Sequence, residues 1–209
     1  MIQSSMVVIG LTGSMAAGKS TISRRMAELG AYIADADKAS RQVVLPGMEG
    51  LAALVERFGS KILRPDGALD RPALAALAFE GEETISDLNA IMHPIIKIEL
   101  QAGMAEARKQ GVKVAVVDAP LLLEAGWQDI CDEVWLVTAP EELRIIRAMA
   151  RDDISRDAAR LRMASQMSDE KKREIADVIL ENNGSIEDLL AEVDAQYRRL
   201  RKDYDEKNH

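Results

Sequence analysis

The sequence has only one cysteine, Cys131, which excludes an internal disulfide and favours a reducing compartment. It also has no apolar run of the roughly 20 residues that a membrane helix needs. The N-terminus has no basic segment ahead of its first apolar run, which argues against a secretory signal. From these absences we expect a cytoplasmic location and no membrane partner.

Positive charge is also in short supply. The chain of 209 residues has 27 Lys and Arg against 35 Asp and Glu, a formal net charge of -8. A general nucleic-acid binder is more often basic, so no nucleic-acid partner is expected. Clusters of Cys and His with metal-ligand spacing are missing, and so is a Gly-x-Ser-x-Gly nucleophile elbow. We expect a monomer, although the sequence does not itself give an oligomeric state.

What the sequence does contain is a phosphate-loop motif near its start. An apolar run at residues 6–11 leads to Gly13, and Gly18, Lys19 and Ser20 follow after four more residues. This is the pattern Gly-x-x-x-x-Gly-Lys-Ser/Thr. The glycines permit backbone angles that a Cβ would forbid, so the loop can turn its N–H groups inward around phosphate oxygens. The residues expected to hold a nucleoside triphosphate are Gly13, Ser14, Met15, Ala16, Ala17, Gly18, Lys19, Ser20 and Thr21.

The residues after the second glycine have separate chemical roles. A helix predicted at residues 20–29 directs its positive end at the same anion. Lys19 adds a full charge for the β- and γ-phosphates, and Ser20 offers its hydroxyl to Mg²⁺. The predicted order of strand, loop and helix is the context that the motif requires.

Two carboxylates, Asp35 and Asp37, follow the next predicted strand, residues 31–34. Ligands of open parallel sheets bind at the carboxyl ends of strands. Because alternate residues of a strand share a face, both carboxylates could point at the phosphates if the extended geometry persists. Alternatively, one of them caps the helix that starts near Lys38. The spacing alone does not choose which of the two would act as a base.

Strands and helices alternate along the chain, which predicts an α/β fold with three layers and a five-stranded parallel sheet. Strands are expected at residues 6–11, 31–34, 113–117, 133–139 and 177–180. Asp118 closes the third of these, as in a Walker B strand whose carboxylate orients Mg²⁺. A last helix, residues 186–204, is expected to cover the sheet with the apolar stripe Ile186, Leu189, Leu190, Val193, Tyr197 and Leu200.

The segment between the second and third strands is longer than an ordinary crossover. Helices are expected there at residues 38–45, 49–58, 71–79, 83–92 and 94–109. Pro94 suits the first turn of a helix, so a break is expected just before it. The excess length predicts an inserted helical subdomain that binds the substrate.

Arginines gather on the helix predicted at residues 140–150 and just beyond it. Arg147 and Arg151 are four residues apart, one above the other, which suits a polyphosphate. Ser155 is a good N-cap for a second helix, residues 156–167. A hairpin of two such helices would serve as a lid that excludes water and brings positive charge to a transferring phosphoryl group.

These features favour a small-molecule kinase over two other classes. A regulatory GTPase would want Asp-x-x-Gly and Asn-Lys-x-Asp, and neither string occurs. A nucleotide-binding interaction protein without turnover has no need of the aspartate pair and the arginines. Nucleosides and nucleoside monophosphates are the alternative acceptors, since their kinases share the same core.

From about residue 7 to residue 197 the sequence resembles the dephospho-coenzyme A kinase family. The segments that carry the resemblance are GLTGSMAAGKST, DADKASRQVV, the pair His93-Pro94, APLLLE, Arg147 and Arg151 with Asp152, and ADVILENNG. The resemblance implies an ATP- and Mg²⁺-dependent kinase that phosphorylates the ribose 3′-hydroxyl of dephospho-CoA, the last step of coenzyme A synthesis. One departure is Met15-Ala16-Ala17, where family members often have Ile-Gly-Ser; no loss is expected, because these positions contribute mainly backbone.

The resemblance also implies roles for individual residues. Asp37 would accept the proton of the 3′-hydroxyl, Lys19 and the phosphate loop would hold ATP, and Ser20 would help hold Mg²⁺. Arg151 would neutralise charge on the transferring group. Arg147 would be a second lid contact, and Asn183 would lie near the ATP base. The dephospho-CoA cleft would be lined by Asp35, Arg41, His93, Leu121, Leu122 and Glu124.

A division of the chain follows from these roles. The nucleotide-binding core would comprise residues 1–37, 111–154 and 174–209. The helical insertion that binds coenzyme A would comprise residues 38–110, and the lid residues 155–173.

Overall fold

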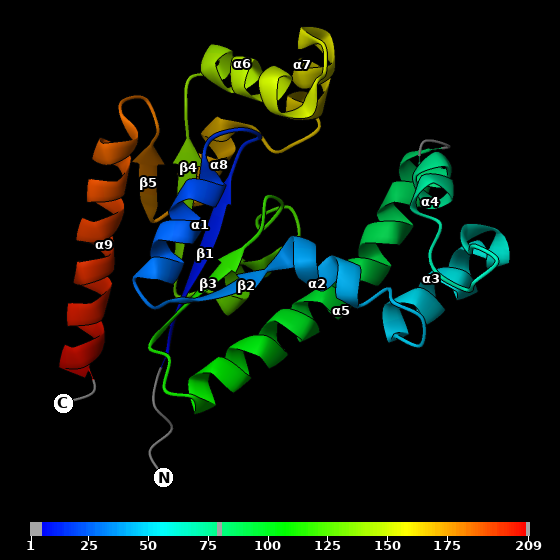
Figure 1. Cartoon of the computed structure of the whole chain (residues 1–209), viewed down its shortest axis with the longest axis horizontal. Coiled ribbons are helices and arrows are strands. Elements are labelled where there is room, and N and C mark those ends of the chain that lie inside the picture. The colour runs from blue at the N-terminus through cyan, green and yellow to red at the C-terminus, as the bar shows by residue number, and fades with distance from the viewer. Residues whose placement is uncertain (1–5, 79–80, 208–209) are drawn as a thin grey trace. The chain divides into compact units, whose positions relative to one another are not determined.

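The structure is a computed structural model that describes residues 6–78 and 81–207 (Figure 1). The chain divides into two compact units. The first comprises Met1–Ala34 and Met104–His209, and the second comprises Asp35–Gly103.

A five-stranded sheet in the order β2-β3-β1-β4-β5 forms the centre of the first unit (Figure 1). Its strands are β1 (Val7–Gly13), β2 (Tyr32–Asp35), β3 (Val114–Asp118), β4 (Glu133–Thr138) and β5 (Val178–Glu181). The central strand β1 pairs in parallel with β3 and β4, and β4 pairs in parallel with β5. The predicted α/β fold with a five-stranded parallel sheet is therefore confirmed.

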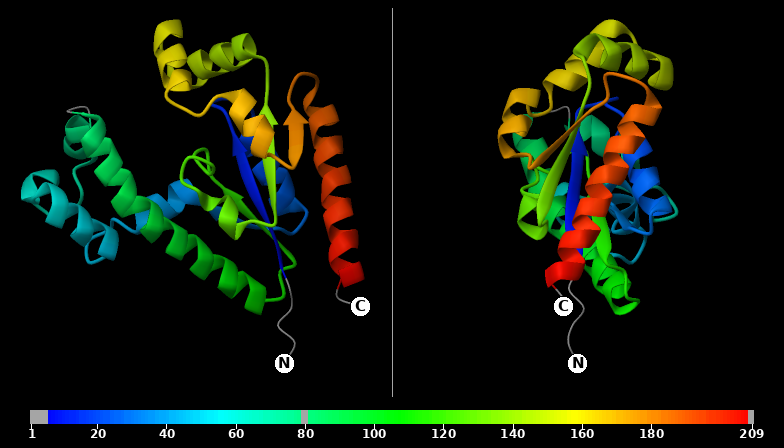
Figure 2. Two further views of the ribbon diagram at one scale, coloured as in Figure 1. Left: turned by 180° about the vertical axis from the view of Figure 1, so that it is seen from behind. Right: turned by 90° about the vertical axis from the view of Figure 1, so that its left-hand side faces the viewer.

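Helices lie on both faces of this sheet (Figure 2). On one face are α1 (Lys19–Glu28) and α9 (Ile186–Lys207), whose apolar side chains join the core formed by alternate residues of the strands. On the opposite face is α8 (Asp169–Ile175), a helix that the sequence analysis did not predict. A short 3₁₀ turn, η2 (Trp127–Ile130), lies between β3 and β4.

The C-terminal helix α9 covers the sheet as expected. Leu189, Val193 and Leu200 are buried in the core, and the hydroxyl of Tyr197 donates a hydrogen bond to the carbonyl oxygen of Leu29 (2.9 Å). The prediction was wrong for Ile186, whose side chain is 58% exposed because the buried stripe begins one turn later.

Two helices form a hairpin beyond the carboxyl end of β4 (Figure 1). They are α6 (Glu141–Asp152) and α7 (Arg156–Ala164), held together by a buried cluster of Ile145, Ala148 and Ala159. Ser155 Oγ accepts a hydrogen bond from the Ala158 N–H (3.2 Å), which confirms the predicted N-cap. The second helix ends earlier than expected, and the chain continues into α8.

The second unit is helical. Its elements are α2 (Ala36–Gln42), α3 (Glu49–Phe58), the 3₁₀ turn η1 (Ser60–Ile62), α4 (Arg71–Ala78) and the larger part of α5 (Glu82–Lys109). Arg57 Nε donates to Asp87 Oδ2 (2.8 Å) and so connects α3 to α5.

The predicted helix break before Pro94 is wrong, since α5 runs through this residue without interruption. Pro94 removes a single N–H donor, and the carbonyl it leaves unpaired belongs to Ala90. Both residues are exposed, so water can satisfy that carbonyl. Although α5 is long, no helix of the described residues is apolar enough over a sufficient length to span a bilayer.

The bond from Tyr197 to Leu29 predicts a stability effect. Tyr197→Phe removes the hydroxyl and leaves the part-buried carbonyl oxygen of Leu29 without this partner, so the free energy of unfolding should fall by about 1 kcal/mol. Urea unfolding monitored by circular dichroism measures this change. The control is Tyr32→Phe, because no hydrogen bond of the Tyr32 hydroxyl is found within the described part of the chain. Equal stabilities of the two variants would contradict the assigned role.

Candidate active site

The phosphate loop connects β1 to α1, and its two glycines are needed for different reasons. Gly18 has φ 104°, a left-handed conformation, and a Cβ there would also collide with Asn182 Nδ2. Gly13 is not in this conformation. A Cβ on it would lie 2.6 Å from the carbonyl oxygen of Val137. The expectation that Gly13 is needed for its backbone angles was therefore wrong: it is needed because β1 packs closely against β4.

The loop leaves several N–H groups together without an acceptor. The Ala17 N–H donates to Ser14 O (3.0 Å) and the Met15 N–H to Gln166 Oε1 (3.1 Å). For the N–H groups of Ala16, Gly18 and Lys19, no acceptor is found among residues 6–78 and 81–207. Such unpaired donors at the positive end of a helix form a nest for an anion.

Ala16 stands at φ 61°, in the left-handed region that favours glycine. It packs, with Met15, against the buried cluster that joins α6 to α7. The loop conformation therefore depends on contacts outside the loop as well as on its glycines.

Lys19 forms an ion pair with Asp118, the last residue of β3. Asp118 lies opposite Leu11 in the register of β1 and β3, which places its carboxylate beside the loop. Both side chains are largely buried, with 19% and 12% exposed. The predicted Walker B position thus lies in contact with the phosphate-loop lysine.

These residues fit a magnesium site of the kind found in phosphoryl-transfer enzymes. Mg²⁺ usually keeps several waters and takes one or two protein oxygens together with substrate phosphates. Ser20 is exposed at the start of α1, and Asp118 provides a carboxylate on the neighbouring strand. In the described part of the chain, no group of three or more His, Cys, Asp or Glu could hold a metal ion.

The turn after β5 contacts the loop through Asn182. Asn182 is buried, and its Nδ2 donates to the carbonyl oxygen of Ala17 (2.9 Å). Its Oδ1 accepts from Arg147 Nη2 at 3.5 Å. Asn183, which the sequence analysis placed near a nucleotide base, is exposed and donates to Glu181 Oε2 (3.1 Å). The turn was recognised in the sequence, but not which asparagine faces inward.

Arg147 and Arg151 lie on α6, as predicted. The guanidinium of Arg151 is 61% exposed and donates to both carboxylate oxygens of Asp152, at 2.7 Å and 2.9 Å. These hydrogen bonds raise the pKa of Arg151 above its ordinary value and lower the pKa of the Asp152 carboxyl. The arginine is charged and mostly accessible on the hairpin.

The loop after β3 contains three residues predicted to line a substrate cleft. Leu121 is exposed, but Leu122 is completely buried against the position of Gly10 in β1. Leu122 is therefore a core residue, and its assignment to the cleft was wrong. Glu124 Oε1 accepts from the Met167 N–H (2.9 Å) and lies 3.2 Å from Nζ of the buried Lys172.

In the second unit, the structure distinguishes the two aspartates. Asp35 Oδ1 accepts from the Lys38 N–H (3.0 Å), so Asp35 is the N-cap of α2. The expected extended geometry does not persist, because the helix begins at Ala36. Asp37 is exposed in the first turn of α2, and its carboxylate has no partner among the residues that the structure describes.

Two further predicted site residues belong to this unit. Arg41 is exposed in the last turn of α2. His93 is half-buried on α5, and this burial lowers the pKa of its imidazole below the ordinary value.

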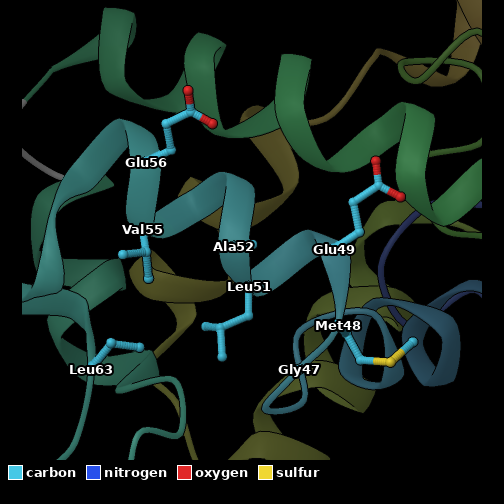
Figure 3. A pocket seen from close by; sticks show the side chains of 8 residues that line it. All are labelled: Gly47, Met48, Glu49, Leu51, Ala52, Val55, Glu56 and Leu63. Atoms are coloured by element: carbon cyan, nitrogen blue, oxygen red, sulfur yellow. The ribbon is translucent and has the colours of Figure 1, made fainter.

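A groove of about 610 Å³ runs beside α3 in the second unit (Figure 3). Leu51 and Val55 point to one side of α3, while the carboxylates of Glu49 and Glu56 point to another (Figure 3). Its lining residues are Gly47, Met48, Glu49, Leu51, Ala52, Val55, Glu56 and Leu63. None of them is a residue that the sequence analysis assigned to the site.

Sequence reasoning missed the residues that hold the loop from outside. They are Gln166, Asp169 and Asn182, each of which contacts a residue of the phosphate loop. A signal for α8 was present: Ser168 precedes Asp169 and Glu170, as at a helix start, and its Oγ accepts from the Lys171 N–H (3.4 Å). No local pattern indicates which distant residues these side chains reach.

This chain is similar to known proteins over most of its length. The model of the dephospho-CoA kinase family matches residues 7–188. A dephospho-CoA kinase from Geobacter sulfurreducens is 46% identical over 184 residues, which cover 88% of this chain and 93% of that protein. The crystal structure of a Thermus thermophilus protein has a TM-score of 0.78 at 33% identity and covers 94% of this chain and 98% of its own. The structure of the dephospho-CoA kinase from Campylobacter jejuni has a TM-score of 0.70 at 28% identity, covering 93% and 97%. This chain belongs to the dephospho-CoA kinase family.

Proposed function

We propose that this protein transfers the γ-phosphoryl group of ATP to the ribose 3′-hydroxyl of dephospho-CoA, which gives coenzyme A and ADP. Membership of the dephospho-CoA kinase family carries the proposal. The phosphate loop supports it, because unpaired N–H groups and Lys19 suit the phosphates of ATP.

On the donor side, Lys19 would exchange its partner Asp118 for the β- and γ-phosphates. The N–H groups of Ala16, Gly18 and Lys19 would hold the same phosphates. Ser20 and Asp118 would hold Mg²⁺. When bound, the ion neutralises charge on the phosphate oxygens.

On the acceptor side, Asp37 would accept the proton of the 3′-hydroxyl. The capping bond of Asp35 supports this choice, because it commits one carboxylate to the backbone and leaves the other accessible. Asp35, Arg41 and His93 remain proposed contacts of dephospho-CoA. The second unit as a whole would bind that substrate.

The hairpin of α6 and α7 would act as the lid. Its Arg151 would exchange part of its contact with Asp152 for the transferring phosphoryl group, and Arg147 would lie at the nucleotide. A monomer in the cytoplasm remains our expectation for the protein.

The experiment that tests the acceptor is an ADP-release assay with four acceptors side by side: dephospho-CoA, adenosine, AMP and CMP. Release of ADP should be fastest with dephospho-CoA, and the product should carry the new phosphate on the 3′ position in a phosphorus NMR spectrum. Turnover restricted to a nucleoside or a monophosphate would replace dephospho-CoA by that acceptor.

Substitution of Asp35 and of Asp37 distinguishes the helix N-cap from the proposed general base. Asp37→Asn should lower kcat by at least roughly 10²-fold, because the acceptor hydroxyl loses its general base, while ATP binding stays intact. Asp35→Asn is the comparison variant, since asparagine caps a helix about as well as aspartate, and loss of its proposed substrate contact should raise the KM for dephospho-CoA. Its kcat should change much less. If Asp37→Asn turns over at the unchanged rate, Asp37 is not the base.

The role of Lys19 predicts a loss on the donor side. Lys19→Ala should weaken ATP binding and lower kcat by about 10² to 10³, as for the loss of one charge-stabilising donor. Titration calorimetry with ATP and steady-state kinetics measure the two effects. Lys109→Ala, an exposed position at the end of α5, is the control. Unweakened ATP binding in Lys19→Ala would refute the assignment of the loop.

A further inference from the structure

The segment between α7 and α8 is bound to the outer side of the phosphate loop. Gln166 Oε1 accepts from the Met15 N–H (3.1 Å), and Asp169 Oδ1 accepts from the hydroxyl of Ser14. The two bonds are made to consecutive residues of the loop. They come from side chains more than 150 positions away in the sequence, with separations of 151 and 155.

Asp169 is itself fixed by a buried arginine. Arg144 Nη2 donates to Asp169 Oδ2 (2.8 Å), and Arg144 Nε donates to the carbonyl oxygen of Ala139 (2.9 Å). The side chain of Arg144 is 9% exposed, so water screens this ion pair little. The pair neutralises a carboxylate that would otherwise stand unpaired beside a phosphate-binding loop.

The same segment is held on a second side by the loop after β3. The Met167 N–H donates to Glu124 Oε1 (2.9 Å), and the completely buried Lys172 lies 3.2 Å from that oxygen. Glu124 therefore fixes the segment on its other side. Residues 166–169 are thus fixed on both sides, which gives Gln166 and Asp169 a rigid base.

The loop needs such support because its backbone includes a conformation that an isolated peptide of this sequence would disfavour. Ala16 occupies a left-handed conformation that is disfavoured for a residue with a Cβ. Among the N–H groups that follow Met15, those of Ala16, Gly18 and Lys19 have no acceptor in the described part of the chain. Gln166 accepts from the Met15 N–H and so fixes the backbone just before Ala16, whose N–H is the first of those that have no acceptor among the residues that the structure describes.

We propose that Gln166 and Asp169 are positioning residues that hold the phosphate loop in its anion-binding shape. The inference rests on the proposed function of the loop as the ATP site, and it does not depend on the identity of the acceptor. Through these residues the lid hairpin and the phosphate loop are joined, so the end of the lid sets the geometry of the donor site.

The test replaces Gln166 by two residues of similar length. Gln166→Met removes the accepting oxygen and leaves the Met15 N–H unpaired, so the Kd of ATP should rise by about 10-fold. Gln166→Glu keeps an accepting oxygen but adds a negative charge near the phosphates, so at high salt, where this charge is screened, its Kd for ATP should rise much less than that of Gln166→Met. Asp169→Asn leaves only one accepting oxygen for Ser14 and Arg144, and its Kd for ATP should rise by about 3-fold or more.

Direct ATP binding by calorimetry is the primary readout, with thermal unfolding and both KM values measured on the same samples. The KM for ATP should follow the Kd, while the KM for the acceptor should change by less than about 2-fold. Gln110→Met, an exposed position at the end of α5, is the matched control.

Two outcomes would overturn the positioning role. One is an unchanged Kd for ATP in Gln166→Met. The other is a loss that appears equally in Gln166→Glu and in both KM values, which is what general destabilisation produces. Failure of the proposed acceptor looks different, since the unchanged protein would then bind ATP without phosphorylating dephospho-CoA.

Discussion

Backbone N–H groups without partners are costly in a folded protein, and the phosphate loop keeps several of them together. Contacts with other parts of the chain hold the loop in the shape that keeps these groups together. Three side chains from other parts of the chain do this: Gln166, Asp169 and Asn182. The central strand β1 adds the close packing of Gly13 against β4, which brings the loop to the edge of a rigid sheet.

The second constraint is charge. A protein that binds a polyphosphate needs cations at its site, and these must not repel one another before the ligand arrives. Here two of the proposed cations have a carboxylate beside them: Lys19 has Asp118, and Arg151 has Asp152. Such pairs are exchangeable, because a phosphate oxygen offers the same acceptor with more charge. Arg144 differs, since it is buried and bonded to a backbone carbonyl as well as to a carboxylate. Its contacts make it part of the framework.

The sequence was sufficient for features that depend on local pattern. Strand β1, the loop and α1 were predicted within two residues of their bounds, because hydrophobic runs and the glycine spacing are local signals. The contacts that shape the loop join residues far apart in the chain, so no local pattern reveals them. At Pro94, by contrast, a local signal predicted a helix break that the structure does not have. Proline in mid-helix normally signals a break, but at an exposed position a single missing donor does not end a helix that continues on both sides.

The aspartate pair shows how one backbone detail decides between chemical roles. Sequence spacing treats Asp35 and Asp37 alike, because alternate residues of a strand face the same way. The helix that begins at Ala36 removes this equivalence: Asp35 binds the backbone of α2, and Asp37 faces solvent. Several other carboxylates discussed above have partners in the described structure, namely Asp118, Glu124, Asp152 and Asp169. The carboxylate of Asp37 is exposed and has no partner among the described residues. Proton transfer requires an accessible and uncommitted carboxylate, so this geometry supports the role that we propose for Asp37.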